Sequence, residues 1–156
     1  MSALLNGAFN KHLKFADMIQ VYEDSFVVVL YDKAQDLIEY CYKPNKGMLD
    51  DVYIKSMTKY GEATELYKPS KLLVNTVNSL YTIPPELQEW TAKEIAPKTV
   101  CLKQLAFLLP KDIFSQVALE QMLDEKGISD VYSGIRYFED LGEAEKWLGV
   151  RSNFSV

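Results

Sequence analysis

The chain has few of the residues on which metal and nucleophilic centres usually depend. It contains one histidine, His12, and two cysteines, Cys41 and Cys101, among 156 residues. Two cysteines with this spacing cannot form a disulfide framework or a C-x-x-C motif, and a single imidazole cannot assemble a histidine-rich metal centre. We therefore interpret both cysteines as free thiols and expect no metal and no other cofactor.

Sequence motifs of the common enzyme classes are also absent. The seven glycines form neither G-x-G-x-x-G nor G-x-x-x-x-G-K, and there is no G-x-S-x-G nucleophile elbow. Glu86 and Glu89 share a predicted helical face and could suggest acid–base chemistry. However, Glu86 lies in a first helical turn and Glu89 can pair with Lys93 four residues on. We predict that the protein is not an enzyme.

Long hydrophobic runs and a positive charge balance are missing as well. The most apolar runs, residues 26–31 and 105–109, are far shorter than the roughly 18–20 residues of a membrane span. A formal charge of −5 argues against a broad nucleic-acid-binding surface. The N-terminus lacks the basic stretch and apolar block of a signal peptide. We expect a cytoplasmic protein with no membrane span and no nucleic-acid partner.

The first third of the chain, after an extension of residues 1–17, is rich in β-branched and aromatic residues. Three such runs with short polar breaks predict an antiparallel meander of strands. They cover residues 19–22, 25–31 and 36–43. In the third run, Ile38, Tyr40 and Tyr42 alternate with other residues, so one face of that strand should carry the aromatic rings.

Helical and strand patterns alternate in the rest of the chain. Further strands are predicted at residues 71–75, 104–109 and 135–138. Helices follow each of them and the third strand, and Asp112 and Asp140 are the predicted caps of the last two. In the helix after Asp112, the residues at helical spacing are Phe114, Val117, Ala118 and Gln121.

This order predicts an α/β fold in a single domain of residues 18–148. Its mixed sheet begins as an N-terminal antiparallel meander and continues as alternating helices and strands. Residues 149–156, after the terminating Gly149, are predicted to be a flexible tail.

Six stretches of the second half have a familiar spacing. They are IPPELQEW at 83–90, IAP at 95–97, LAF at 105–107, DIFSQ at 112–116, RYF at 136–138 and AEKWL at 144–148. This pattern resembles the SpoIIAA-like proteins, a bacterial family grouped with STAS and SEC14-like domains. The resemblance covers roughly residues 19–148 and implies a four- or five-stranded mixed sheet flanked by helices.

The resemblance also bears on regulation. STAS domains that resemble anti-sigma-factor antagonists are controlled by phosphorylation of a hydroxyl at a helix N-terminus, where exposed amides respond strongly to a dianion. The matching position here is Pro84, which cannot be phosphorylated, and Ser79 and Thr82 lie outside the pattern position. The usual phospho-acceptor is therefore missing.

Polar residues follow the predicted parallel strands at their carboxyl ends, where open α/β sheets usually bind ligands. The candidate ligand- or partner-binding residues are Asn75, Thr76, Asn78, Ser79, Lys111, Asp112 and Ser115. A small anion or an acidic group of a partner could be held there by helix N-termini, Lys111 and the asparagines. In the simpler alternative, Asp112 caps a helix and the asparagines and serines belong to turns.

Ten tyrosines are the most unusual feature of the composition. They are concentrated in the first half, where they include Tyr31, Tyr40, Tyr42, Tyr53, Tyr60 and Tyr67. Tyrosine buries a large area and keeps a polar tip, so these side chains could line a protein contact or an apolar cleft between the meander and the first helix. The interpretation that we favour is that they are ordinary core and boundary residues.

These observations favour a non-catalytic interaction or regulatory module of the SpoIIAA-like or STAS type, with a protein partner and with a homodimer as an option. Residues 1–17 carry Leu5, Phe9 and Leu13 at four-residue spacing and could dock on a partner or on a second copy of the chain, or could equally form a disordered terminus. The alternative is a small-molecule, lipid or amphiphile-binding protein. It would use the rim at the carboxyl ends of the parallel strands or the tyrosine-lined cleft.

Overall fold

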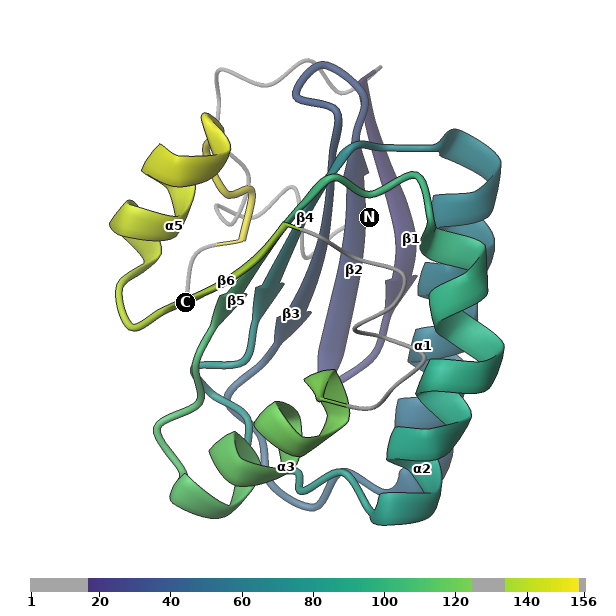
Figure 1. Ribbon diagram of the computed structural model, residues 1–156, viewed down its shortest axis with the longest axis vertical. Coiled ribbons are helices and arrows are strands. Elements are labelled where there is room, and N and C mark those ends of the chain that lie inside the picture. Colours follow the sequence, from purple (N-terminus) through teal and green to yellow (C-terminus); the bar gives the residue numbers. More distant parts are fainter. Residues whose placement is uncertain (1–16, 125–133, 155–156) are drawn as a thin grey trace.

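The computed structural model describes residues 17–124 and 134–154, whose strands form one mixed sheet (Figure 1). The strands are β1 (Met18–Glu23), β2 (Val27–Asp32), β3 (Leu37–Tyr42), β4 (Lys71–Asn75), β5 (Gln104–Leu108) and β6 (Ile135–Phe138). Their order in the sheet is their order in the chain. β1, β2 and β3 pair antiparallel, whereas β3 to β6 pair parallel, which confirms the predicted α/β fold class.

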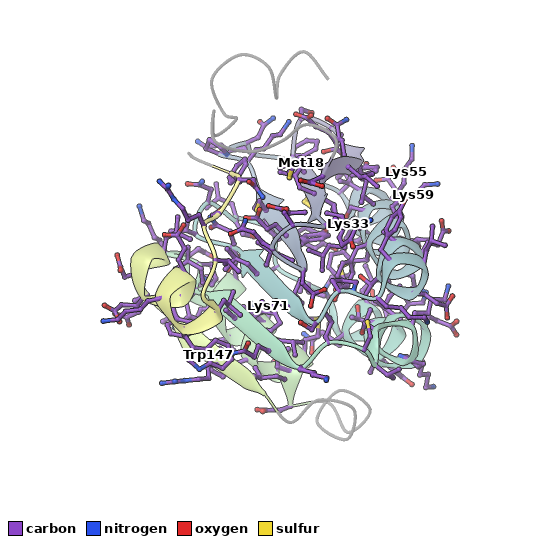
Figure 2. The ribbon with its side chains drawn as sticks, turned by 90° about the horizontal axis from the view of Figure 1, so that it is seen from above. Met18, Lys33, Lys55, Lys59, Lys71 and Trp147 are labelled. Carbon is purple, nitrogen blue, oxygen red and sulfur yellow. The ribbon has the colours of Figure 1, made fainter. Side chains whose placement is uncertain are left out.

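Helices cover both faces of the sheet. They are α1 (Asp50–Tyr67), α2 (Pro85–Trp90), α3 (Ile113–Leu123) and α5 (Leu141–Leu148). α1, α2 and α3 contribute to one hydrophobic cluster, whereas α5 packs in a second cluster against the other face. Figure 2 shows this division, with Lys55 and Lys59 of α1 on one side of the sheet and Trp147 of α5 on the other.

The central strands are buried on both faces, as expected for a sheet covered by helices on both sides. In β3, Ile38, Tyr40 and Tyr42 belong to the cluster beneath α1, α2 and α3, which confirms the predicted face. Leu37 and Cys41 point to the opposite face and pack in the two other clusters. A single strand therefore connects the two halves of the core.

Local signals in the sequence set several helix ends. Asp112 accepts a hydrogen bond of 2.8 Å from the backbone N–H of Ser115, and Asp140 accepts one of 3.0 Å from that of Glu143, so both predicted caps are confirmed. α5 ends at Gly149, whose φ of 71° is the left-handed conformation that glycine adopts without strain. After α2, the backbone passes through a π-helical turn, Thr91–Ile95, and a 3₁₀ turn, Ala96–Thr99.

The packed face of α3 differs from the predicted one. Phe114 is 73% exposed and Val117 is 45% exposed. The buried residues are Ser115, Ala118, Leu119, Met122 and Leu123. Because α3 is apolar on nearly all sides, residue spacing alone could not select the inner face.

The prediction of a flexible tail is wrong for the described residues 149–154. Residues 150–154, which we call the C-terminal strap, return to the face of the sheet opposite α1, and Asn153 and Phe154 are buried. The Asn153 side-chain nitrogen donates hydrogen bonds to Glu39, at 2.9 Å, and to Asp32, at 3.2 Å. Buried carboxylates need such donors, and this need holds the strap in place.

Two further predictions from the sequence concern the N-terminal extension and membrane spans. The predicted extension lies outside the described residues apart from Asp17, whose carbonyl accepts a hydrogen bond of 2.8 Å from the Lys33 N–H. Within the described parts of the chain, no helix combines the length and apolar character needed to cross a bilayer.

Candidate functional site

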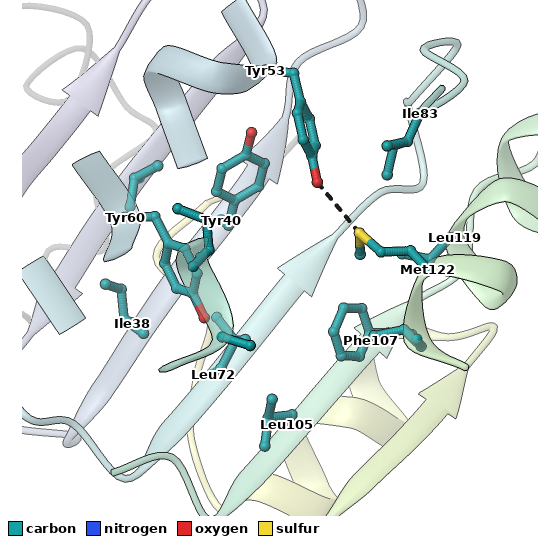
Figure 3. Packing of buried hydrophobic residues seen from close by; sticks show 14 of the residues in the cluster. Ile38, Tyr40, Tyr53, Tyr60, Leu72, Ile83, Leu105, Phe107, Leu119 and Met122 are labelled. Carbon is teal, nitrogen blue, oxygen red and sulfur yellow. Dashed lines mark hydrogen bonds between the residues drawn. The ribbon is translucent and has the colours of Figure 1, made fainter. Parts of the chain in front are cut away.

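An apolar cavity of about 70 Å³ lies between the sheet, helices α1 and α3, and the π-helical turn Thr91–Ile95 (Figure 3). Its walls include tyrosines from the last strand of the meander and from the first helix, which is where the sequence suggested a cleft. They are Tyr40, Tyr42, Tyr53 and Tyr60. Phe107 of β5 and Leu119 and Met122 of α3 line the same space. We call it the tyrosine cavity.

Hydroxyl pairs hold the aromatic walls in position. The Tyr53 hydroxyl lies 2.7 Å from Thr91 Oγ1 and donates a hydrogen bond of 3.3 Å to the sulfur of Met122. The Tyr40 hydroxyl lies 2.5 Å from Ser56 Oγ. Because these polar tips bond to wall residues, the rings present mainly carbon to the cavity.

The electrostatic environment of the tyrosine cavity suits an uncharged guest. Burial raises the pKa of the Tyr40, Tyr42 and Tyr53 phenols above their usual range, so all three stay protonated at physiological pH. None of the described residues that line the cavity is charged. A charged group in this space would lose its hydration without gaining a partner.

The predicted rim at the carboxyl ends of the parallel strands is present. Several of its side chains form hydrogen bonds within the loop that follows β4 or to the neighbouring strand. The Asn75 side-chain oxygen accepts a hydrogen bond of 3.2 Å from the Val77 N–H. Thr76 donates from its hydroxyl to the Leu108 carbonyl at 2.6 Å, which ties the end of β4 to β5. Ser79 Oγ accepts a bond of 3.3 Å from the Tyr81 N–H. These three predicted site residues are buried and serve the loop itself.

The other predicted residues divide between a cap and a groove. Asp112 accepts from both the N–H and the hydroxyl of Ser115, so this pair fixes the start of α3. Asn78 and Lys111 line an open groove of about 480 Å³ on the rim. This rim groove is formed by residues 44–46, 77–80 and 111–112.

The rim groove and the tyrosine cavity share one lining residue in the loop after β4. Ser79 lines both spaces, and Thr76 and Ser115 line the cavity close to the same strand ends. In Figure 1 the arrowheads of β3, β4 and β5 point to the edge of the sheet where α3 lies. Three of the predicted rim residues, Thr76, Ser79 and Ser115, therefore line the tyrosine cavity near the carboxyl ends of the strands.

Sequence reasoning missed Lys46, which lines the rim groove together with Lys111. The rim was predicted only from the loops that follow the strands ending near Asn75, Leu109 and Phe138. β3 is parallel to β4, so the loop after β3 reaches the same edge. Counting β3 among the parallel strands would have placed Lys46 on the rim.

A second polar cluster lies on the opposite face, beneath the C-terminal strap. Glu39 and Asp32 are fully buried there. Burial raises the pKa of Glu39 to about 7, against the lowering effect of hydrogen bonds from Ser152 and Asn153, and nearby Asp32 raises it further. Within residues 17–124 and 134–154, no group of three or more His, Cys, Asp or Glu side chains is arranged to hold a metal ion. We assign this cluster a structural role.

Comparisons with known proteins find no matching family model, no matching curated protein and no matching solved structure. We therefore infer the function of this chain from the geometry of the tyrosine cavity and the rim groove.

Proposed function

We propose that the protein is a non-catalytic binding module that holds a small apolar group in the tyrosine cavity. The observation that carries the proposal is an uncharged, aromatic-walled space within the main core, next to the carboxyl ends of parallel strands. Apolar cavities of this kind stay dry and accept apolar guests. Ligand sites are usually mostly apolar hollows with a few polar groups nearby.

The size of the cavity limits the guest. Its volume of about 70 Å³ is roughly half of the ~150 Å³ of an engineered apolar cavity that binds benzene. Only the end of a short alkyl chain fits in this volume. We therefore choose 1-hexanol, a neutral molecule whose chain can enter by its methyl end while the hydroxyl end stays outside, as the first probe.

The test is a calorimetric titration of the full chain with 1-hexanol. Leu119→Phe places a larger side chain at the wall of the cavity, whereas Val117→Phe changes the exposed side of the same helix. We expect saturable binding to the wild type and to Val117→Phe, and at least about five-fold weaker binding to Leu119→Phe. Thermal melts of all three proteins verify that they fold.

The proposal is overturned if the wild type shows no saturable binding, or if Leu119→Phe binds as well as the wild type. Equal weakening in a folded Val117→Phe protein would also contradict it. That result would place the binding site on the outside of α3.

The interaction function predicted from the sequence is the second candidate, because α3 has an apolar outer side. Ile113, Phe114 and Val117 are 63%, 73% and 45% exposed. The simplest occupant is a second copy of the chain, since a two-fold contact would cover this patch on both molecules at once. Light scattering of the wild type and of Phe114→Glu tests it: a dimer lost in the variant supports the candidate, and a wild-type monomer removes it.

Membership of the SpoIIAA-like or STAS group is also part of the proposal. A mixed sheet flanked by helices supports this membership, and Pro84 stands at the N-cap of α2 as expected, but the sheet has six strands and not the four or five that the resemblance implies. The lack of catalysis and the cytoplasmic location stay predictions.

A further inference from the structure

Two lysines on the rim groove have no partner of opposite charge. Lys46 and Lys111 are exposed, and neither forms a salt bridge with any described residue. Lys43, which precedes the groove in the chain, differs, because it bonds to Glu23 at 2.5 Å and to the Asp24 carbonyl. The groove therefore offers two ammonium groups that remain available to a ligand.

The acidic residue of the groove only partly offsets these charges. Asp112 is engaged through one carboxylate oxygen with the N–H and hydroxyl of Ser115. Two lysines and one carboxylate leave one positive charge in the groove. This balance suits a monoanion better than a dianion or a cation.

An unsatisfied donor lies in the same groove. The side-chain nitrogen of Asn78 is buried and has no hydrogen-bond partner among the described residues. A buried amide without a partner costs free energy, and an anionic oxygen from a ligand would satisfy it. The adjacent residue, Ser79, lines both the groove and the tyrosine cavity, so this donor belongs to the residue next to a wall that the two spaces share.

We propose that the ligand is an anionic amphiphile, with a short apolar chain in the tyrosine cavity and a single carboxylate held in the rim groove by Lys46, Lys111 and Asn78. This inference rests on the proposed apolar binding function. The lining of the cavity is uncharged, so the anionic group of such a ligand must lie outside it. The groove provides the cationic and amide groups that a carboxylate requires at that point.

The experiment compares three probes: hexanoate, 1-hexanol and acetate. Hexanoate carries both parts of the proposed ligand, 1-hexanol lacks the charge, and acetate lacks the chain. At low salt we expect wild-type protein to bind hexanoate about five-fold more tightly than 1-hexanol, because exposed ion pairs contribute modestly. Acetate should show no saturable binding, and 0.5 M salt should remove most of the preference for hexanoate.

The test variant is the double substitution Lys46→Gln and Lys111→Gln. It should lose the preference for hexanoate and keep its affinity for 1-hexanol. The matched control is Lys55→Gln with Lys59→Gln, which removes the same charge from two lysines of α1 (Figure 2) that do not line the groove. This control should keep the preference.

The outcomes separate the two proposals. Binding of 1-hexanol without any preference for hexanoate overturns the inference and leaves the apolar binding function intact. No binding of either probe overturns both. Acetate binding as tight as that of hexanoate, or an equal loss of preference in both double variants, also contradicts the inference.

Discussion

The hydroxyl of Tyr53 donates a hydrogen bond to the sulfur of Met122, which lies 3.3 Å away and 69 residues later in the chain. The contact joins α1 to α3 above the sheet, as Figure 3 shows. The same hydroxyl lies 2.7 Å from Thr91 Oγ1, which in turn donates to the Leu87 carbonyl. Helices from three crossovers thus meet at one phenol, and the tyrosine cavity is enclosed beside it.

Removal of this hydroxyl should destabilise the protein without unfolding it. For Tyr53→Phe we expect a loss of about 1 kcal/mol in the free energy of unfolding, the usual value of a buried hydrogen bond. Tyr67→Phe is the control, because Tyr67 is 37% exposed and its stacking on Tyr31 does not need the hydroxyl. Urea denaturation measures both. Equal effects in the two variants would mean that the contacts of Tyr53 do not join the helices.

The carboxyl group of Glu39 should make stability depend on pH. Burial is the main cause that raises its pKa from 4.5 to about 7 in the folded protein. The folded state therefore holds this proton more tightly than the unfolded state does. The resulting stabilisation is complete below about pH 4.5 and is lost as the pH rises through about 7.

Glu39→Gln should remove this dependence. Relative to the variant, the free energy of unfolding of the wild type should fall by about 3 kcal/mol between pH 4.5 and pH 7. Glu89→Gln, at an exposed carboxylate on α2, should keep the wild-type profile. Denaturant titrations across this range provide the measurement, and parallel profiles for wild type and Glu39→Gln would contradict the assignment.

Two glycines should respond to alanine in opposite directions. A Cβ at Gly61, within α1, would make ordinary contacts of 3.5–3.6 Å with Ile95 and Lys98, so Gly61→Ala should stabilise the helix by about 0.5–1 kcal/mol. A Cβ at Gly134 would lie 2.1 Å from the carbonyl oxygen of Lys103. Gly134→Ala should therefore disturb the pairing of β5 with β6 and lower the melting temperature. An unchanged melting temperature in Gly134→Ala would show that there is more space between Gly134 and the Lys103 carbonyl than the structure has.

Local sequence signals predicted most of the strands and several helix ends. β4 and β6 have the predicted bounds, because each is a short apolar or β-branched run between turn residues. The caps Asp112 and Asp140 follow from side-chain chemistry that acts within three residues. Such signals do not depend on the rest of the fold.

Tertiary contacts explain what the sequence did not reveal. Glu39 occupies a strand position opposite the aromatic face, and its partner Asn153 is 114 residues away. No local pattern reports that contact, so the C-terminal strap was missed. The rim residues were predicted from strand order. The position of Lys46 on the rim depends on the parallel pairing of β3 with β4, and the cavity beside the tyrosines depends on which face of α3 turns inward.

The most direct test of the tyrosine cavity follows the methyl groups of the methionines during a titration with 1-hexanol. Met122 and Met57 line the cavity, whereas Met18 packs in the cluster on the opposite face of the sheet. In ¹³C-methyl-methionine NMR spectra, we predict saturable shifts of the Met122 and Met57 signals with one shared affinity and an unchanged Met18 signal. Unchanged Met122 and Met57 signals at saturating 1-hexanol would contradict the account.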